Sequence, residues 1–365
     1  MATPAGSAHS VKLVRVLDDA GVAETAIPLE TRVALYRHMR RLRRFDERMT
    51  ALQRQGRIGF YGAATGQEAP PVAVALAARP SDWLFPALRE GGALFVRGLP
   101  VSTYLAQLLG CARDPLKGRQ MPNHVASRSV SVVSWSSAIA TQLPQAVGAA
   151  MAMRAGGRTD AAVAVLGDGA TSHPDFHAAL NFAGVFRAPV LLVCTNNQYA
   201  LSVPSTRQTA SSTFAEKALA YGVNAARVDG NDALAVFEVA RDALERARAG
   251  GGATLVECVT YRLGAHSSSD DPSRYRDPSE VEHWLKKDPL ERLARHLARE
   301  SRHGTDIDQA IDAELDRELD QALAELEGGP PPPLDSLFDD VYGELPWNLA
   351  EQRGELAAVM RDVSR

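Results

Sequence analysis

Short, continuous apolar runs alternate with longer amphipathic stretches between residues 130 and 262. The amphipathic stretches 174–186 and 232–250 have helical spacing, and Pro174 occupies the first position of one of them, where a missing N–H costs nothing. The apolar runs are predicted to be buried strands and lie at 161–167, 188–195, 224–230 and 253–262. Strands that alternate with helices predict an α/β fold, a doubly wound and mostly parallel sheet covered on both faces.

Helical patterns flank this region on both sides. Residues 1–27 indicate a loose arm with a short helix, and 28–55 form an amphipathic pattern whose many basic residues we expect on a solvated face. After residue 275 the chain is helical again, and Asp277 and Asp288 each precede a proline in the manner of a helix N-cap.

These patterns divide the chain into three parts. We expect an N-terminal arm and helix at 1–55 and an α/β domain at 56–275. A C-terminal helical extension at 276–365 is expected to pack on the same domain, with an apolar stripe along 305–327.

Composition excludes several classes of protein. The net charge is −4, from 40 basic and 44 acidic residues, which indicates no nucleic-acid or membrane surface. The three cysteines show no CxxC spacing, which fits a reducing compartment. No apolar run approaches the roughly 20 residues of a membrane span, and the first 30 residues lack a signal-peptide core. We therefore expect a cytoplasmic protein.

Polar residues follow three of the predicted strands. Asp168 follows the strand at 161–167, Asn196 and Asn197 follow the next, and His266 comes after the last. Because parallel strands end at one edge of a sheet, these side chains are expected to converge there. Carboxylate and amide oxygens suit Mg²⁺, which phosphate oxygens of a ligand usually complete.

Two glycines and a helix are expected to serve the same ligand. Gly167 and Gly169 would let the backbone approach it closely, and the helix at 174–186 would direct its first N–H groups at a diphosphate. A GDG turn alone is a weak signal, because Asp-Gly turns are common. A buried strand ending in GDG, followed by a helix and a second buried strand ending in NN, is far more specific.

The segment GDGATSHPDFHAALNFAGVFRAPVLLVCTNN resembles the thiamine diphosphate motif. From about residue 30 onward the chain is similar to the alpha subunit of the decarboxylating dehydrogenase component of 2-oxo acid dehydrogenase complexes. The resemblance depends on several motifs in the right order, including FYGAATGQEA (60–69), SSAIATQLPQAVGAA (136–150) and ELPWNLAEQ (344–352). HSSSDDPSRYR (266–276) is most similar to the branched-chain members.

The resemblance implies a cofactor site. Asp168, Asn197 and the carbonyl of Tyr199 match positions that hold Mg²⁺, and the magnesium holds the diphosphate of thiamine diphosphate. The backbone at Gly169 and Ala170 is implied to touch the diphosphate, with Gly167 beside it.

Other positions match the rest of the cofactor site. Arg89 matches an arginine that reaches the diphosphate, and Ser137 and Ile139 match residues along the middle of the cofactor. His266 matches the active-site histidine, and both His266 and Ser137 are predicted catalytic residues. A K⁺ site is left open by a set of matching positions: Ser136, Ala138, Thr141 and Gln142.

Some positions depart from the family pattern or stand outside it. Ala87 and Leu88 replace a polar and a tyrosine residue before Arg89, and Thr195 stands where branched-chain members often have arginine. These changes remove partners of the diphosphate. His124 and His177 are expected to be structural. Ser267 matches a position that is phosphorylated in mitochondrial relatives.

The implied activity needs partners. In the family, a glutamate on a beta subunit acts on the cofactor, so we expect an α₂β₂ heterotetramer that decarboxylates a branched-chain 2-oxo acid and acylates the lipoyl group of an acyltransferase. The alternatives are a pyruvate or acetoin dehydrogenase alpha subunit and a catalytically silent scaffold subunit. A nucleotide-binding module would need a GxGxxG motif, which the sequence lacks.

Overall fold

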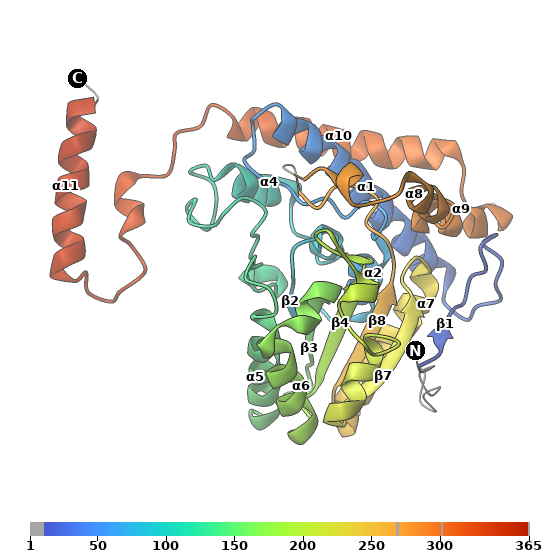
Figure 1. Cartoon of the computed structure of the whole chain (residues 1–365). Coiled ribbons are helices and arrows are strands. Elements are labelled where there is room, and N and C mark those ends of the chain that lie inside the picture. Colours follow the sequence, from blue (N-terminus) through green and yellow to red (C-terminus); the bar gives the residue numbers. More distant parts are fainter. Residues whose placement is uncertain (1–10, 268–269, 301, 364–365) are drawn as a thin grey trace.

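A six-stranded parallel sheet forms the centre of the molecule (Figure 1). The computed structural model describes residues 11–267, 270–300 and 302–363. The sheet confirms the predicted α/β class. In spatial order its strands are β1 (Leu13–Val14), β7 (Asn224–Asp229), β8 (Thr254–Val259), β4 (Val190–Asn196), β3 (Ala162–Gly167) and β2 (Trp83–Phe85).

Alternate residues of the central strands enter two separate cores. Leu192 of β4 packs in the cluster under α5 (Gln142–Ala155) and α6 (Pro174–Val185). Val193, the next residue, packs in the cluster under α2 (Ala69–Ala77) and α7 (Ala233–Arg246). Successive side chains of a strand point to opposite faces, so a sheet covered on both sides needs continuous apolar strands.

The register of the sheet brings three strand ends together. Gly167 at the end of β3 pairs with Thr195, and Asn196 at the end of β4 pairs with Val259 of β8. A short 3-10 helix, Asp168–Ser172, follows β3, and the antiparallel pair β5 (Tyr199–Ala200) and β6 (Val203–Pro204) follows β4.

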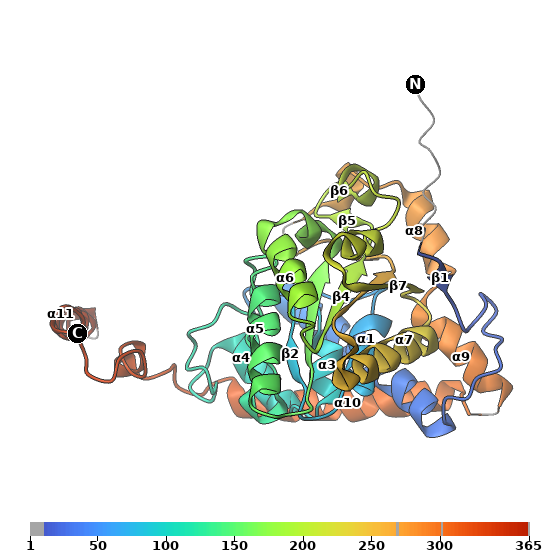
Figure 2. The same ribbon diagram turned by 90° about the horizontal axis from the view of Figure 1, so that it is seen from below.

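Further helices form an outer layer over α2. The long helix α1 (Leu29–Arg54) lies between α2 and α10 (Thr305–Leu326), as Figures 1 and 2 show. The other helices of this part are α3 (Gly91–Val96), α4 (Val101–Leu109), α8 (Pro278–Leu285) and α9 (Pro289–Arg299). Asp277 and Asp288 cap α8 and α9 as predicted, since their carboxylates accept backbone N–H groups there.

The basic face of α1 differs from the solvated face that we expected. Its arginines form ion pairs with acidic residues of α10: Arg40 with Asp312 at 2.5 Å, and both Arg44 and Arg48 with Asp316, at 2.7 and 2.9 Å. Helical residues four positions apart lie on one face, so acids at matching spacing on α10 meet these arginines.

The N-terminal arm contains a strand where we expected a short helix. Leu13 and Val14 form β1, which pairs with β7 at the edge of the sheet. The Asp232 carboxylate then accepts hydrogen bonds from Val16 N and Leu17 N, at 2.7 and 2.6 Å. These tertiary hydrogen bonds stabilise an extended backbone that the local sequence does not specify.

The two ends of the C-terminal region differ in their packing. Helices α8, α9 and α10 lie against the body of the molecule, whereas α11 (Trp347–Val363) stands apart from it in Figures 1 and 2. Trp347 is 80% exposed. The three-part division of the chain remains a prediction. Within the described ranges, no helix is both long and apolar enough to cross a membrane.

Two helical glycines provide a matched test of the packing. A Cβ atom at Gly184 of α6 would overlap the carbonyl oxygen of Tyr221, whereas a Cβ at Gly148 of α5 would meet no atom within 4 Å. We expect Gly184→Ala to destabilise the fold by ~1–3 kcal/mol and Gly148→Ala to stabilise it by ~0.5–1 kcal/mol. Urea unfolding of both variants measures this, and equal effects would contradict the close approach at Gly184.

Candidate active site

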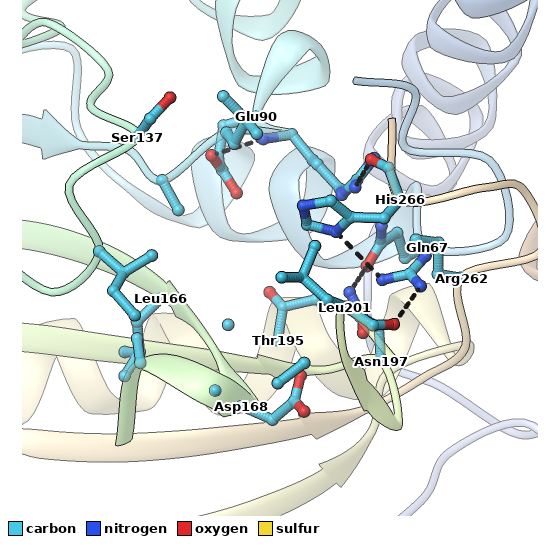
Figure 3. A pocket seen from close by; sticks show the side chains of 18 of the residues that line it. Gln67, Glu90, Ser137, Leu166, Asp168, Thr195, Asn197, Leu201, Arg262 and His266 are labelled. Carbon is cyan, nitrogen blue, oxygen red and sulfur yellow. Dashed lines mark hydrogen bonds between the residues drawn. The ribbon is translucent and has the colours of Figure 1, made fainter. Parts of the chain in front are cut away.

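A cavity of about 510 Å³ lies at the edge where β3, β4 and β8 end (Figure 3). Its walls come from the ends of these strands, the turn before α2, the segment after β2 and the loop before α5. The cavity brings together all the cofactor-site residues predicted from the sequence: Arg89, Ser137, Ile139, Gly167, Asp168, Gly169, Ala170, Asn197, Tyr199 and His266.

Asp168 is buried at the first position after β3 and is 1% exposed. Its Oδ2 accepts a hydrogen bond from Gln208 Nε2 at 2.5 Å. Burial raises the pKa of the carboxyl group above its ordinary value. A bound cation would oppose this shift, because it favours the charged form.

The two asparagines after β4 have different tasks. Asn196 is structural: its Nδ2 donates to Glu257 of β8 at 2.8 Å, and its Oδ1 accepts from Gln198 N at 3.2 Å. Gln198 has a φ of 76°, a left-handed conformation that this side-chain cap supports. The tight turn that results brings Asn197 and Tyr199 to the lining of the cavity.

Asn197 and Tyr199 offer oxygen atoms to this space. Asn197 Nδ2 donates to Gln67 Oε1 at 3.1 Å, and Asn197 Oδ1 lies 3.4 Å from Tyr199 N. The Tyr199 carbonyl accepts from Arg262 Nη1 at 3.3 Å, which leaves its second lone pair free.

Two arginines, Arg89 half-buried and Arg262 buried, line the cavity together with the acidic Asp168 and Glu90. Arg89 donates to the carbonyl of His266 at 2.6 Å and Arg262 donates to that of Leu201 at 3.0 Å, so both bind neutral acceptors there. Burial and the nearby Arg262 lower the pKa of Arg89 to about 10. Two desolvated cations facing one cavity favour an anionic ligand.

His266 is held beside the same arginines. Its backbone N–H donates to Asp270 at 2.7 Å, and its Nδ1 lies 3.5 Å from Arg262 Nη1. Burial, followed by the charges of Arg89 and Arg262, lowers the pKa of the imidazole to about 4. The ring is therefore neutral near pH 7.

Ser137 has a partner that we did not expect. Its hydroxyl lies 2.5 Å from Nε2 of His124, whose Nδ1 lies 3.0 Å from the carbonyl of Pro122. A carbonyl only accepts, so Nδ1 carries the hydrogen and Nε2 accepts from Ser137. His124 thus orients a predicted catalytic hydroxyl. His177 contacts Tyr221 and lies outside the cavity lining, in agreement with a structural role.

The cavity is open to solvent beside Ile139. Ile139 lines the cavity and is nevertheless 54% exposed. Of the positions matched to a K⁺ site, Thr141 Oγ1 donates to the Ala138 carbonyl at 2.7 Å and Gln142 Nε2 donates to the Val165 carbonyl at 2.7 Å. The potassium site remains a prediction.

The glycines and the following helix only partly match the expectation. A Cβ at Gly169 would lie 2.6 Å from Cβ of Ala200, so glycine allows this close approach, and Gly167 borders open space. Helix α6 begins at Pro174, and the side chain of His173 caps it. Because the 3-10 helix intervenes, Gly169 and Ala170 line the cavity in place of the first residues of α6.

The residues fit a magnesium-bound diphosphate. Among the described residues, no group of three or more His, Cys, Asp and Glu side chains could hold a metal ion, so a cation here would depend on amide and carbonyl oxygens beside Asp168. Such hard oxygen ligands suit Mg²⁺. Buried Gln67 Nε2 and Thr195 Oγ1 border the cavity, and neither has a hydrogen-bond partner in the described part of the chain. Ala87 and Leu88, which like Thr195 depart from the family pattern, also line the cavity.

The sequence profile described as "Dehydrogenase E1 component" matches residues 36–334. The chain belongs to the dehydrogenase E1 component family. It is 42% identical over 357 residues to the 2-oxoisovalerate dehydrogenase subunit alpha of Pseudomonas aeruginosa, covering 94% of this chain and 87% of that protein. The resemblance predicted from the sequence motifs is confirmed.

Other relatives of this E1 component have similar names. The 3-methyl-2-oxobutanoate dehydrogenase subunit alpha of Mycobacterium tuberculosis is 40% identical over 332 residues, which cover 91% of this chain and 88% of that protein. The mitochondrial 2-oxoisovalerate dehydrogenase subunit alpha of Homo sapiens is 37% identical over 353 residues, which cover 95% of this chain and 79% of the relative.

Four polar residues of the site in this E1 component were not predicted from the sequence. Gln67, Glu90 and Arg262 line the cavity, and Gln208 holds Asp168. Gln67 lies inside FYGAATGQEA, a motif of the resemblance, and Arg262 lies four residues before His266. Gln208 lies in a loop without a recognisable pattern.

The buried carboxyl group of Glu90 gives a testable pH dependence. Burial raises its pKa from 4.5 to about 7, so the folded E1 component holds this proton where the unfolded chain has released it. Glu90 therefore costs stability increasingly as the pH rises from 4.5 to about 7. We expect Glu90→Gln to gain up to about 3 kcal/mol over wild type between pH 5 and pH 8. Urea unfolding at both pH values measures it, and a pH-independent difference would contradict the shift.

Proposed function

We propose that this E1 component is the alpha subunit of a thiamine diphosphate-dependent 2-oxo acid dehydrogenase that decarboxylates a branched-chain 2-oxo acid. The observation that carries the proposal is the cavity at the sheet edge, where hard oxygen ligands lie beside Arg89 and Arg262. The names of the relatives support the substrate class, because the three relatives described above are named for 2-oxoisovalerate or 3-methyl-2-oxobutanoate.

The residues of the cavity divide the work of binding. Asp168, Asn197 and the Tyr199 carbonyl would hold Mg²⁺, and the backbone at Gly169 with Arg89 would bind the diphosphate. Gly167 and Ala170 would border it, and Ser137 and Ile139 would lie along the middle of the cofactor. Phosphate oxygens would supply the anionic charge that the arginines favour.

Bound thiamine diphosphate supplies the electron sink for the loss of CO₂ from a 2-oxo acid. The protein contributes a neutral His266. Because Arg262 donates toward Nδ1 at 3.5 Å, the ring carries its hydrogen on Nε2 and can donate it to an oxygen of the bound acid. Ser137, oriented by His124, offers its second lone pair as an acceptor. Both groups would position the substrate in the cavity.

The site is incomplete without a partner. We infer a beta subunit in an α₂β₂ heterotetramer that covers the exposed side of Ile139, and a lipoyl-bearing acyltransferase that receives the acyl group. A cytoplasmic location remains a prediction, since relatives include bacterial and mitochondrial proteins. K⁺ at Ser136 and its neighbours and phosphorylation of Ser267 likewise remain predictions.

A catalytically silent scaffold subunit is the second candidate. Ala87, Leu88 and Thr195 favour it, because apolar or short side chains replace partners of the diphosphate. The intact set of Asp168, Asn197 and His266 opposes it. A pyruvate or acetoin dehydrogenase is opposed by the names of the relatives.

Mixing this chain with its beta subunit separates these functions. We expect Mg²⁺-dependent thiamine diphosphate binding and decarboxylation of 2-oxoisovalerate in preference to pyruvate. Asp168→Ala should lower cofactor affinity by at least ~100-fold, because it removes a charged metal ligand. Asp242→Ala, on the exposed face of α7, is the control and should bind normally. Cofactor retained after gel filtration and the rate of CO₂ release are the measurements. A mixture that binds no cofactor in excess Mg²⁺ would establish the scaffold.

A further inference from the structure

Gln67 is a buried cavity residue to which the sequence motifs assign no role. It is 1% exposed and lies on the turn that precedes α2 (Figure 3). Its Oε1 accepts the hydrogen bond from Asn197 Nδ2 at 3.1 Å. Its Nε2 is buried at the cavity and has no partner among the described residues. The oxygen of this carboxamide is therefore hydrogen-bonded, whereas its NH₂ group has no partner among the described residues.

The turn that carries Gln67 is fixed at several points. The Thr65 carbonyl accepts from Leu263 N at 3.1 Å, and the Gly66 carbonyl accepts from Thr260 Oγ1 at 3.1 Å. Gly66 N donates to Glu68 at 3.0 Å. Gly66 has a φ of 91° and packs so closely against Leu263 that a Cβ would lie 2.6 Å from that side chain. The backbone of Gln67 is thus held in place before any ligand binds.

The same strand ends hold both partners. Thr260, which follows β8 and binds the turn, donates its N–H to the carbonyl of Asn196 at 2.9 Å. Gln67 and Asn197 are therefore placed by one rigid junction between β4, β8 and the turn. Their hydrogen bond spans 130 positions of sequence.

An asparagine can present either end of its amide to a cavity, since oxygen and NH₂ have nearly equal size. Only the oxygen can bind a cation. The bond to Gln67 Oε1 engages the NH₂, and Oδ1, which accepts a long hydrogen bond from Tyr199 N at 3.4 Å, has a second lone pair for a cation. We propose that Gln67 is a positioning residue that orients Asn197 with its oxygen toward Mg²⁺. The inference rests on the proposed function, because it assumes that Asn197 binds the metal.

The free end of Gln67 has a second task. A buried N–H without a partner is costly, and an oxygen of the bound diphosphate would satisfy Nε2. The acceptor end of Gln67 thus acts on the metal through Asn197, and the donor end acts on the anion directly. Substitutions can separate the two ends.

Three variants of the complex with the beta subunit test the inference. Gln67→Met keeps the shape of the side chain and removes both its hydrogen-bond acceptor and its donor. Gln67→Glu keeps the acceptor and replaces the donor with a negatively charged oxygen. Gln107→Met is the control for loss of a buried glutamine, because Gln107 lies outside the cavity lining and bonds to the backbone of Ala126, at 3.0 Å. Mg²⁺ is titrated at saturating thiamine diphosphate, and thiamine diphosphate at saturating Mg²⁺, with retained cofactor as the readout.

We expect Gln67→Met to raise the half-saturating Mg²⁺ concentration at least ~10-fold, the usual effect of losing a residue that orients a metal ligand. Gln67→Glu should remain within about threefold of wild type for Mg²⁺ and bind thiamine diphosphate more weakly. Gln107→Met should leave both titrations unchanged. Should Gln67→Met fail to fold, Gln67→Asn replaces it, because the shorter amide cannot reach Asn197.

Two results would overturn the inference. One is a Gln67→Met complex that binds Mg²⁺ like wild type. The other is a Gln67→Glu complex that is as impaired for Mg²⁺ as Gln67→Met, which would make the donor end alone responsible. Failure of the proposed function looks different, because the wild-type complex itself would then show no Mg²⁺-dependent cofactor binding.

Discussion

The parallel register of β3, β4 and β8 is the constraint on which the site depends. It makes three strands end at one edge, so Asp168, Asn197 and His266 approach one another across about 100 positions of sequence, from 168 to 266. These mostly apolar strands bury the sheet on both faces, and the polar groups that line the cavity lie at or after the strand ends. Stability and site therefore have a common origin: the same strands form the two cores and place the ligands. A shift of one residue in the pairing would move Asn197 away from the cavity and turn its neighbours to the wrong face.

Buried polar groups at this edge are satisfied by residues from distant elements. Glu257 of β8 holds Asn196, Gln208 holds Asp168, and the turn before α2 brings Gln67 to Asn197. A buried amide or carboxylate without such partners would lose its orientation and cost stability. The two arginines are held differently, because each donates to a backbone carbonyl at the cavity: Arg89 to that of His266 and Arg262 to that of Leu201. An anionic ligand would give both guanidinium groups a charged partner.

The local patterns predicted four of the six strands of the sheet (β3, β4, β7 and β8), most helices and the convergence at the sheet edge, because periodicity and strand ends are properties of short segments. The same patterns did not predict features that depend on contacts between residues far apart in the sequence. The edge strand β1 depends on β7 and Asp232, and the α1 arginines find their acids on α10, more than 250 positions away. His124 was expected to be structural because nothing near it in sequence shows that Ser137 lies within hydrogen-bond distance. Gln208 carries no motif, and only the folded loop brings it to Asp168.

The departures at Ala87, Leu88 and Thr195 bear on affinity more than on chemistry. All three line the cavity, and Thr195 Oγ1 is a buried hydroxyl that no other described residue hydrogen-bonds. A short hydroxyl can still donate to a phosphate oxygen, but with no charge and less reach than an arginine. Leu88 adds apolar surface directly beside Arg89, where desolvation strengthens the remaining charge interactions. The oxygen ligands, the arginines and His266 are unaffected by these changes. A silent scaffold would not need a neutral histidine beside Arg262, a hydroxyl oriented by His124 or a glutamine that fixes Asn197. The geometry therefore favours an enzyme that binds its cofactor with lower affinity.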